Sequence, residues 1–293
     1  MRRWFSLLLA PAVLLSACGG SSNGGAGDTP ASVQSVPAQS PPPATTTSVS
    51  PAQLPPLQPN LAVVRVLGLY SNEAAAIYPD IDLRIDHLFN LANTIAADSD
   101  VPVRFELTQI MATSYPDAYL ITEALETLIF ANHAAFADAE TLRDQTGADL
   151  VTFFRPYAND GLCGYARVGG YQTDGDLSNP AEVEFGYSVV AIDCSDYTLV
   201  HELGHNLGLV HSRREDPSGG SLPFGAGYGI DNDFVTIMAS PTAFNAIRLP
   251  LFSSPHAICN GQPCGLDAAD PTQGADAVLA LRQVVDQVAA YRN

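Results

Sequence analysis

The sequence predicts an α/β domain built on a twisted, mostly parallel β-sheet, which follows an export signal and a polar tether. From residue 61 onward, short apolar runs alternate with stretches of helical periodicity, and strands that alternate with helices form parallel sheets. The chain has 293 residues, of which 46% are hydrophobic, a share that is usual for soluble globular proteins. We therefore assign residues 61–293 to one folded domain.

Strands are predicted where an apolar run is short and lacks helical spacing. A short edge strand is predicted over residues 164–170, which are rich in glycine. The other runs are predicted to form the body of the sheet, and they cover residues 63–69, 103–110, 150–154 and 188–192.

Helices are predicted where apolar residues recur every three or four positions. The first covers residues 82–97 behind a capping Asp, and its apolar stripe is Leu83, Leu88, Leu91 and Ile95. The second covers residues 120–146, is broken near Phe136, and ends at Gly147, a residue type that suits left-handed helix ends. The last covers residues 275–291, with a stripe made of Val278, Leu281, Val284, Val285 and Val288.

The first residues are typical of an exported lipoprotein. A basic start precedes an apolar stretch over residues 4–15, which Pro11 interrupts and which is shorter than the roughly 20 residues that span a bilayer. The sequence Leu-Ser-Ala-Cys at residues 15–18 resembles the bacterial lipobox, in which the cysteine is lipidated. We predict a signal peptide over residues 1–17 and a lipid anchor at Cys18. An ordinary signal peptide with an unrelated cysteine is the alternative.

Residues 18–60 are predicted to be a disordered tether between the lipid and the domain. They are rich in Ser, Gly, Thr, Pro and Ala and contain almost no large apolar residues. Gly19 stands where an Asp would favour the inner membrane, so a cell with two membranes would place the protein in the outer one. The predicted location is the bacterial cell envelope, outside the cytoplasm.

The charge of the chain excludes one class of function. Only 13 basic residues stand against 31 acidic ones, which gives a formal net charge of −18. Such a surface repels nucleic acid and anionic membranes, so no nucleic-acid partner is predicted. We expect a monomer whose partners are its substrate and the membrane that holds its lipid.

The cysteines fit an oxidising compartment. Once Cys18 is assigned to the lipid, an even set of four remains, for which three pairings exist. Cys259 and Cys264 lie five residues apart, so a local Cys259–Cys264 disulfide is the simplest pairing, and it leaves Cys163–Cys194 as the second. A redox or metal role is the alternative, although no Cys-x-x-Cys spacing occurs.

The stretch from His201 to His211 carries the pattern of a catalytic zinc site. Two histidines four residues apart on a helix, His201 and His205, can direct both imidazoles at one ion. Glu202 lies off that face, where it can reach a water molecule at the metal as a general base. Gly208 allows the helix to stop in a left-handed turn, after which His211 can return as the third ligand. Three neutral histidines leave the fourth zinc position open, as catalytic sites do.

These residues match the metzincin signature HExxHxxGxxH, and their context resembles the reprolysin-like (adamalysin-like) bacterial members, including peptidyl-Asp metallopeptidases. The further matches are residues 148–151, 163–166, 188–191, 249–253 and a Met-turn at 236–239. The resemblance implies a metzincin-like α/β domain, α+β by some schemes, with one antiparallel edge strand and a zinc helix that ends at Gly208. An irregular lower part would close with the C-terminal helix, and substrate would lie extended along the edge strand.

The resemblance also assigns Met238 as the apolar floor beneath the histidines, and a simple core methionine is the alternative. Two residues depart from the pattern. Residue 212 is Ser, where reprolysins usually have Asp, and residue 240 is Ser, so the Met-turn tyrosine of astacin-like members is absent. The subfamily therefore stays open.

The predicted activity is hydrolysis of peptide bonds by a zinc metalloendopeptidase with one catalytic Zn²⁺. Glu202 would take a proton from the attacking water and deliver it to the leaving amine. Two alternatives belong to other classes: a non-catalytic adhesin on the same scaffold, and a hydrolase of cell-wall peptides. The presence of Glu202 opposes the first.

Arg248 is a candidate for substrate specificity. In metzincins the segment after the Met-turn lines the pocket for the side chain just after the cleaved bond, and Arg248 is the only cation between residues 240 and 255. A guanidinium there would favour Asp or Glu. Against it, Phe244, Ile247 and Leu249 favour an apolar side chain, and the acidic surface opposes acidic substrates at long range.

Overall fold

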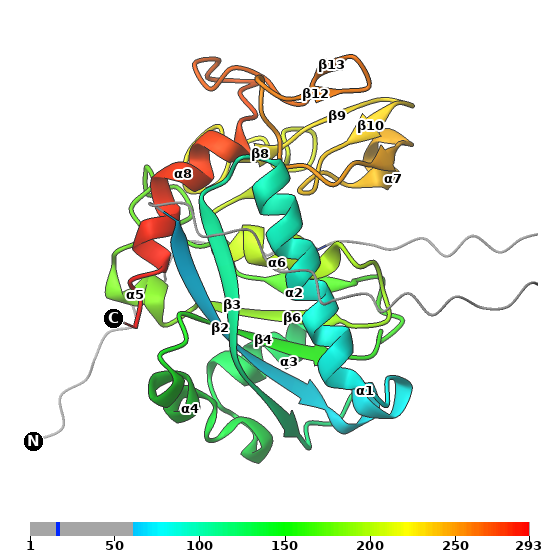
Figure 1. The fold of residues 1–293 in the computed structure, drawn as a ribbon, viewed down its shortest axis with the longest axis vertical. Helices are drawn as coiled ribbons and strands as arrows, with labels where there is room; N and C mark the ends of the chain where they lie inside the picture. The colour runs from blue at the N-terminus through cyan, green and yellow to red at the C-terminus, as the bar shows by residue number, and fades with distance from the viewer. Residues whose placement is uncertain (1–15, 18–60, 293) are drawn as a thin grey trace, which may run out of the picture.

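The domain is organised around a mixed, mostly parallel sheet (Figure 1). The computed structural model describes residues 16–17 and 61–292. The strands of this sheet are β1 (Ser16–Ala17), β2 (Ala62–Ser71), β3 (Val103–Thr113), β4 (Leu150–Arg155), β5 (Gly164–Ala166) and β6 (Tyr187–Ala191), in the spatial order β1-β5-β6-β4-β2-β3. The pairs β2–β3, β2–β4 and β4–β6 are parallel, and β5 runs antiparallel to β6. The predicted sheet is confirmed.

Strand β5 differs from its prediction in two respects. It ends at Ala166 rather than at residue 170, because the chain then turns toward the histidine helix, where the Gly169 N–H donates to the His205 carbonyl at 2.9 Å. It is also not the outermost strand among the described residues. Ser16 and Ala17 of β1 pair with it antiparallel, opposite Ala166 and Tyr165. The outer edge of β5 is therefore able to take on an extended segment.

Helices cover both faces of the sheet (Figure 1). Helix α2 lies across one face, and α3 and α4 lie on the other, where their apolar residues form a second core with β4 and β6. None of the helices in the described residues is long and apolar enough to cross a membrane. The helices up to the histidine segment are α1 (Asn72–Ile77), α2 (Ile81–Asp98), α3 (Ile121–Ile129), α4 (Ala139–Thr146), α5 (Pro180–Val183) and α6 (Thr198–Asn206).

The predicted helix over residues 120–146 is two helices joined by a short 3₁₀ turn at Ala134–Phe136. The break near Phe136 is confirmed, but it is wider than predicted and begins at Phe130. Phe136 is buried against Tyr115 and Phe153, so the chain leaves helical geometry in order to bury this ring. Gly147 ends α4 in the left-handed region with φ of 62°, as its position predicted.

Helix α2 is confirmed, but one residue of its predicted stripe is wrong. Leu83 is 69% exposed, whereas Ile85 and Leu88 are buried against the sheet. The helix begins at Ile81, which is buried. The residues that face the sheet recur at helical spacing from Ile81, and Leu83 falls outside that series. Asp80 precedes the helix, yet its side chain makes no capping hydrogen bond.

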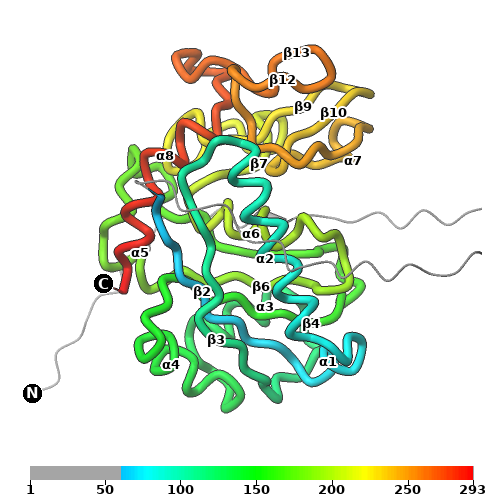
Figure 2. The backbone as a smooth tube through the Cα atoms, viewed as in Figure 1, coloured from blue at the N-terminus to red at the C-terminus, as the bar shows by residue number. Residues whose placement is uncertain are grey.

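The chain after α6 forms an irregular end of the molecule, shown by the yellow and orange tube in Figure 2, before the red helix α8 (Ala277–Val288) returns beside β2. This end contains only short elements, as predicted. They are β7 (Val210–Ser212), β8 (Ala226–Gly227), β9 (Gly229–Ile230), β10 (Phe234–Val235), α7 (Pro241–Phe244), β11 (Ile247–Arg248), β12 (Ile258–Cys259) and β13 (Gln262–Pro263). The Cys259–Cys264 disulfide closes the turn between β12 and β13 and confirms that pairing.

Helix α8 offers a matched test of the core. All five residues of its predicted stripe are buried, and Leu281 is fully enclosed, whereas Leu279 is 39% exposed. We predict that Leu281→Ala lowers the free energy of unfolding by about 2–5 kcal/mol, because it removes buried methyl groups and leaves a cavity. Leu279→Ala should change it by about 0.5 kcal/mol or less. Urea unfolding of both variants measures the difference, and equal effects would contradict this packing.

Candidate metal centre

Helix α6 carries the first half of the site in the interior of the protein. Its nine residues are all buried, including His201, Glu202 and His205. The helix ends at Asn206, and Gly208 follows in the left-handed region with φ of 84°. A side chain at Gly208 would also collide with Ser221, since a Cβ there would lie 2.3 Å from the Ser221 Oγ. This turn reverses the chain as predicted.

The three histidines converge on one point. Strand β7 follows the turn and brings His211 back beside the helix. One ring nitrogen from each of the three histidines lies within 4.8 Å of the other two, and the Nε2 atoms of His201 and His211 are 3.2 Å apart. The structure therefore brings together all three residues that the sequence proposed as ligands.

Hydrogen bonds to backbone carbonyls fix the tautomers of two of these histidines. The Nδ1 of His201 lies 2.8 Å from the Ile237 carbonyl oxygen, and the Nδ1 of His205 lies 2.8 Å from that of Leu209. Because a carbonyl only accepts, each Nδ1 carries the hydrogen and each Nε2 keeps its lone pair. The His205 Nε2 is buried and has no hydrogen-bond partner among the described residues. A buried trio of nitrogen lone pairs fits a metal ion such as zinc.

Burial keeps the three imidazoles neutral. It lowers the pKa of His205 to about 3, and the neighbouring His211 contributes in the same direction. Burial and the charge of Arg248 lower the pKa of His211 to about 4. The pKa of His201 also falls well below its usual value, mainly through burial. Neutral imidazole is the form that binds metals, so the site is ready for an ion at neutral pH.

Met238 lies directly below the histidine helix. It is fully buried, and a Cβ at Gly204 would come within 2.6 Å of its sulfur. Gly204 stands between the two histidines of α6, so the missing side chain allows the thioether to pack under the helix. The preceding residue, Ile237, supplies the carbonyl that holds His201. This position is the one that the resemblance assigned to the Met-turn methionine.

Glu202 follows His201 on α6, and its side chain packs against strand β5. Both carboxylate oxygens are buried and have no hydrogen-bond partner among the described residues. The side chain fits because residue 164 is glycine: a Cβ there would lie 2.1 Å from the Glu202 Oε1. Burial raises the pKa of Glu202 well above its usual value, and the charge of Arg248 opposes that rise. A carboxylate without partners beside a metal site has the reactivity that a general base needs.

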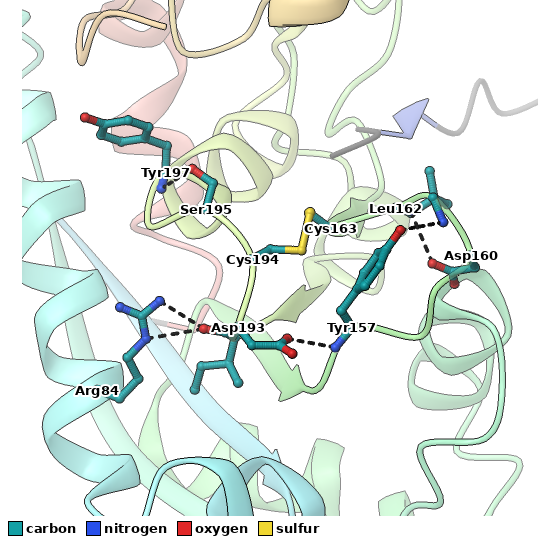
Figure 3. Close-up of a disulfide and its surroundings, with 11 residues drawn as sticks. Arg84, Tyr157, Asp160, Leu162, Cys163, Asp193, Cys194, Ser195 and Tyr197 are labelled. Carbon is teal, nitrogen blue, oxygen red and sulfur yellow. Dashed lines mark hydrogen bonds between the residues drawn. A yellow bond between two sulfur atoms is a disulfide. The ribbon is translucent and has the colours of Figure 1, made fainter. Parts of the chain in front are cut away.

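The Cys163–Cys194 disulfide joins β5 to the loop that leads into α6 (Figure 3). Cys163 directly precedes Gly164, and its carbonyl accepts the Ala191 N–H at 2.7 Å. On the same loop, the Asp193 carboxylate accepts the Tyr157 N–H at 2.8 Å (Figure 3). The pairing predicted from the sequence is confirmed, and it fastens the strand that contacts Glu202.

Arg248 lies on β11, where it pairs with Val235 just before the Met-turn. One guanidinium nitrogen donates to the Ala239 carbonyl at 3.0 Å, directly after Met238. The charge of Arg248 acts on the pKa of three residues of the site, namely His201, Glu202 and His211. The structure thus brings this cation within electrostatic range of the candidate centre.

Two acidic residues of the site were missed from the sequence. The Asp216 carboxylate accepts the His211 N–H at 3.2 Å and lies 3.5 Å from its Nδ1. The Glu215 carboxylate accepts hydrogen bonds from the Ser212 hydroxyl at 2.7 Å and from the Ser240 N–H at 3.3 Å. Glu215 therefore connects the third-ligand strand to the Met-turn through the two serines that depart from the family pattern. The sequence feature that could have indicated them is the acidic pair Glu215 and Asp216, shortly after the histidine motif.

Comparison with known proteins agrees with this geometry. The fold and the histidine site define a metallopeptidase-type domain. Residues 83–212, which include all three histidines and Glu202, match the family described as metallo-peptidase family M12B, reprolysin-like. A solved structure titled "Structure of a chaperone-substrate complex" shares the fold with a TM-score of 0.61 at 22% identity, over 80% of this chain and 35% of that one.

Three bacterial relatives share the name peptidyl-Asp metalloendopeptidase. The chain is 32% identical to the one from Pseudomonas aeruginosa over 250 residues, which cover 78% of this chain and 40% of the relative. It is 27% identical to those from Xanthomonas campestris pv. campestris and Stenotrophomonas maltophilia, over 79% of this chain in each case and 52% and 53% of the relatives. The chain thus spans about half the length of the curated relatives it matches, or less.

The lowered histidine pKa values predict how metal binding responds to acid. An imidazole with a pKa of 6.5 loses about tenfold in metal affinity per pH unit below that value, because protons compete for the lone pair. With pKa values of about 3 for His205 and about 4 for His211, affinity should change little from about pH 7.5 to about pH 5.5 and should fall only as pH approaches 4. Competitive titration with Zn²⁺ against a calibrated chelator measures this. A loss of about 100-fold by pH 5.5 would contradict it.

Proposed function

We propose that this protein is a zinc-dependent endopeptidase with His201, His205 and His211 as the metal ligands and Glu202 as the general base. The observation that carries the proposal is the position of Glu202, whose buried and unpartnered carboxylate lies between the histidines and the strand that can hold a peptide. The reprolysin-like match and the names of the three relatives support the same activity.

Strand β5 is proposed to hold the substrate. Its outer edge pairs antiparallel with Ser16 and Ala17, so its backbone groups are suited to an extended segment. Gly164, at the start of this strand, contacts Glu202. A peptide bond bound opposite Gly164 would thus lie next to the proposed base.

The chemistry then follows from the positions of the side chains. Zinc, when bound, supplies a Lewis acid that polarises the scissile carbonyl and lowers the pKa of water. Glu202 removes a proton from the attacking water and returns it to the leaving amine nitrogen. Burial excludes bulk water from the carboxylate, and Arg248 favours its ionised form, which is the form that accepts a proton.

Acidic side chains are the proposed specificity on the carboxyl side of the cleaved bond. Two of the apolar alternatives pack elsewhere: Phe244 is buried with the Arg214 guanidinium carbon 4.0 Å from its ring centre, and Leu249 packs against the cluster of Phe234 and the Cys259–Cys264 disulfide. The third, Ile247, is 65% exposed. The charge of Arg248, in contrast, lowers the pKa of His201 and His211 in the candidate centre itself. The relatives named peptidyl-Asp metalloendopeptidase support the same preference.

The location of the protein is a separate proposal. A lipid at Cys18 would anchor it in the bacterial cell envelope, with residues 19–60 as the tether. The basis is the lipobox-like sequence at residues 15–18. Apart from Ser16 and Ala17, residues 1–60 lie outside the part of the chain that the structure describes.

The general base is tested by Glu202→Gln in the full-length protein. We expect a decrease of about 10²–10⁴-fold in kcat/KM toward casein-derived peptides, because the amide cannot accept the proton. The zinc content should stay at one per chain, since Glu202 lies off the ligand set. Glu106→Gln on the exposed side of β3 is the matched control and should leave activity unchanged. Cleavage by the Glu202→Gln variant at near the wild-type rate would refute the mechanism.

The class of substrate is tested with the wild-type protein. Inactivity on proteins, combined with cleavage of purified peptidoglycan, would point to a cell-wall hydrolase.

The acidic preference is tested by Arg248→Ala. A proteome-derived peptide library digested by the wild-type protein should yield Asp or Glu directly after the cut. The variant should lose that preference by about tenfold or more, because a charge-assisted hydrogen bond contributes about 1.5–3 kcal/mol. An unchanged residue profile would show that Arg248 does not contact that side chain.

The anchor is tested by Cys18→Ser. We predict that this change moves the protein from the membrane fraction to the soluble fraction of the cell envelope and leaves kcat/KM unchanged, because the tether separates the lipid from the domain. Fractionation and immunoblotting measure the distribution. A variant that stays fully membrane-bound would contradict the lipobox interpretation.

A further inference from the structure

Two phenylalanines and an arginine lie together next to the C-terminal end of β5, and the proposed chemistry uses none of them. We name this group, Phe130, Arg167 and Phe185, the aromatic ledge. Phe130 follows α3 and is 59% exposed. Arg167 directly follows β5, and Phe185 lies shortly before β6.

The ledge is held by ring contacts. The Arg167 guanidinium carbon lies 4.1 Å from the centre of the Phe185 ring, and the Phe130 and Phe185 rings meet edge to face at 6.5 Å. Within the described residues, the Arg167 side chain makes neither a hydrogen bond nor an ion pair, and the stacking on Phe185 is its one direct contact of this kind. Its planar donors are thus available to something outside the protein.

Ring contacts place the ledge on the α3 side of the sheet. Tyr165 of β5 packs into the core that α3 forms with the sheet. The Arg167 guanidinium stacks on Phe185, whose ring meets Phe130 at the end of α3, and the charge of Glu126 on α3 acts on Arg167, so Arg167 lies on that side as well.

The register of an antiparallel peptide fixes which part of a substrate meets the ledge. In such pairing, each step forward along β5 is one step backward along the peptide, as the pairs Ser16–Ala166 and Ala17–Tyr165 illustrate. A residue opposite Gly164 lies beside Glu202, where the bond is cleaved. The residue opposite Ala166, the last of β5, therefore lies two positions toward the amino end of the peptide, and the next residue in that direction comes to Arg167 and the ledge.

We propose that the aromatic ledge is a substrate subsite that selects an aromatic side chain about three residues before the cleaved bond. This inference rests on the proposed function, because it takes β5 as the strand that holds the peptide. The bound ring would contact the exposed Phe130 and stack on the guanidinium of Arg167, which Phe185 holds in place.

An aromatic ring fits the ledge better than a carboxylate. Burial lowers the pKa of Arg167, and the charges of Glu182 and Glu126 oppose that effect, so both carboxylates lie within electrostatic range of the guanidinium. An acidic substrate side chain would be repelled by them and by the net charge of −18. A neutral ring avoids that repulsion and also covers the apolar surface of Phe130.

The test uses binding, so that it does not depend on turnover. Full-length Glu202→Gln protein is titrated with fluorescent peptides of one sequence, chosen from the library digest, in which the third residue before the cut is Phe, Ala or Asp. We expect the Phe peptide to bind about fivefold more tightly than the Ala peptide, as stacking and cation–π contacts at a partly exposed site suggest. Arg167→Ala and Phe130→Ala, each added to Glu202→Gln, should remove that preference.

Two further variants separate recognition from damage to the fold. Arg167→Lys keeps the charge but loses the planar guanidinium, and it should lose most of the preference. Arg104→Ala, on β3 at the opposite edge of the sheet, is the matched control and should keep it. If Arg167→Ala and Phe130→Ala both lower thermal stability but leave the ratio of the affinities for the Phe and Ala peptides unchanged, the ledge has a structural role only. That result would overturn the inference.

The remaining outcomes are also decisive. Equal binding of the Phe and Ala peptides, tighter binding of the Asp peptide, or a failure to bind any peptide would each overturn the subsite. A preference for Phe that survives both Arg167→Ala and Phe130→Ala would do the same. If the wild-type protein cleaves the library peptides but the Phe preference is absent, the subsite fails and the proposed activity stands.

Discussion

The close approach of Glu202 to the backbone of Gly164 is the contact on which the rest of the site depends. It joins the helix that carries the histidines to the strand that can hold a peptide, and it leaves no room for a side chain at residue 164. The Cys163–Cys194 disulfide fastens the strand one residue before this contact. The sheet, the disulfide and the histidine helix therefore act together to set the distance between a proposed base and a bound peptide bond.

The three histidines are likewise held in fixed orientations in the interior of the protein. Backbone carbonyls of Ile237 and Leu209 orient two of the imidazoles, and Asp216 does so for His211. These partners come from the turn after the helix and from the Met-turn, so the irregular end of the molecule is needed to complete the centre. Burial keeps the imidazoles neutral, and the absence of a side chain at Gly204 lets Met238 support the helix from below.

Much of this site was predictable because it depends on local spacing. The histidine pattern, the left-handed turn at Gly208 and both disulfides follow from residues close together in the sequence or from a simple count. Contacts between distant segments could not be foreseen: the fit of Glu202 against Gly164, and the link from Glu215 to Ser240, need the folded chain. For the same reason the exposure of Leu83 and the early end of β5 were mispredicted, because both depend on what the neighbouring elements cover. The signal peptide, the lipid at Cys18 and the tether remain predictions.

A double-mutant cycle between Gly164 and Glu202 tests the central contact most directly. Gly164→Ala alone should lower kcat/KM by about 10²-fold or more with the zinc content unchanged, because the added methyl group displaces the carboxylate. Glu202→Ala removes every side-chain atom that a Cβ at Gly164 would meet and will itself reduce activity strongly. If the contact is the reason for the glycine, adding Gly164→Ala to Glu202→Ala should leave the residual kcat/KM nearly unchanged. Strictly additive losses would contradict the account, because they would mean that Gly164 serves the strand and not the position of the base.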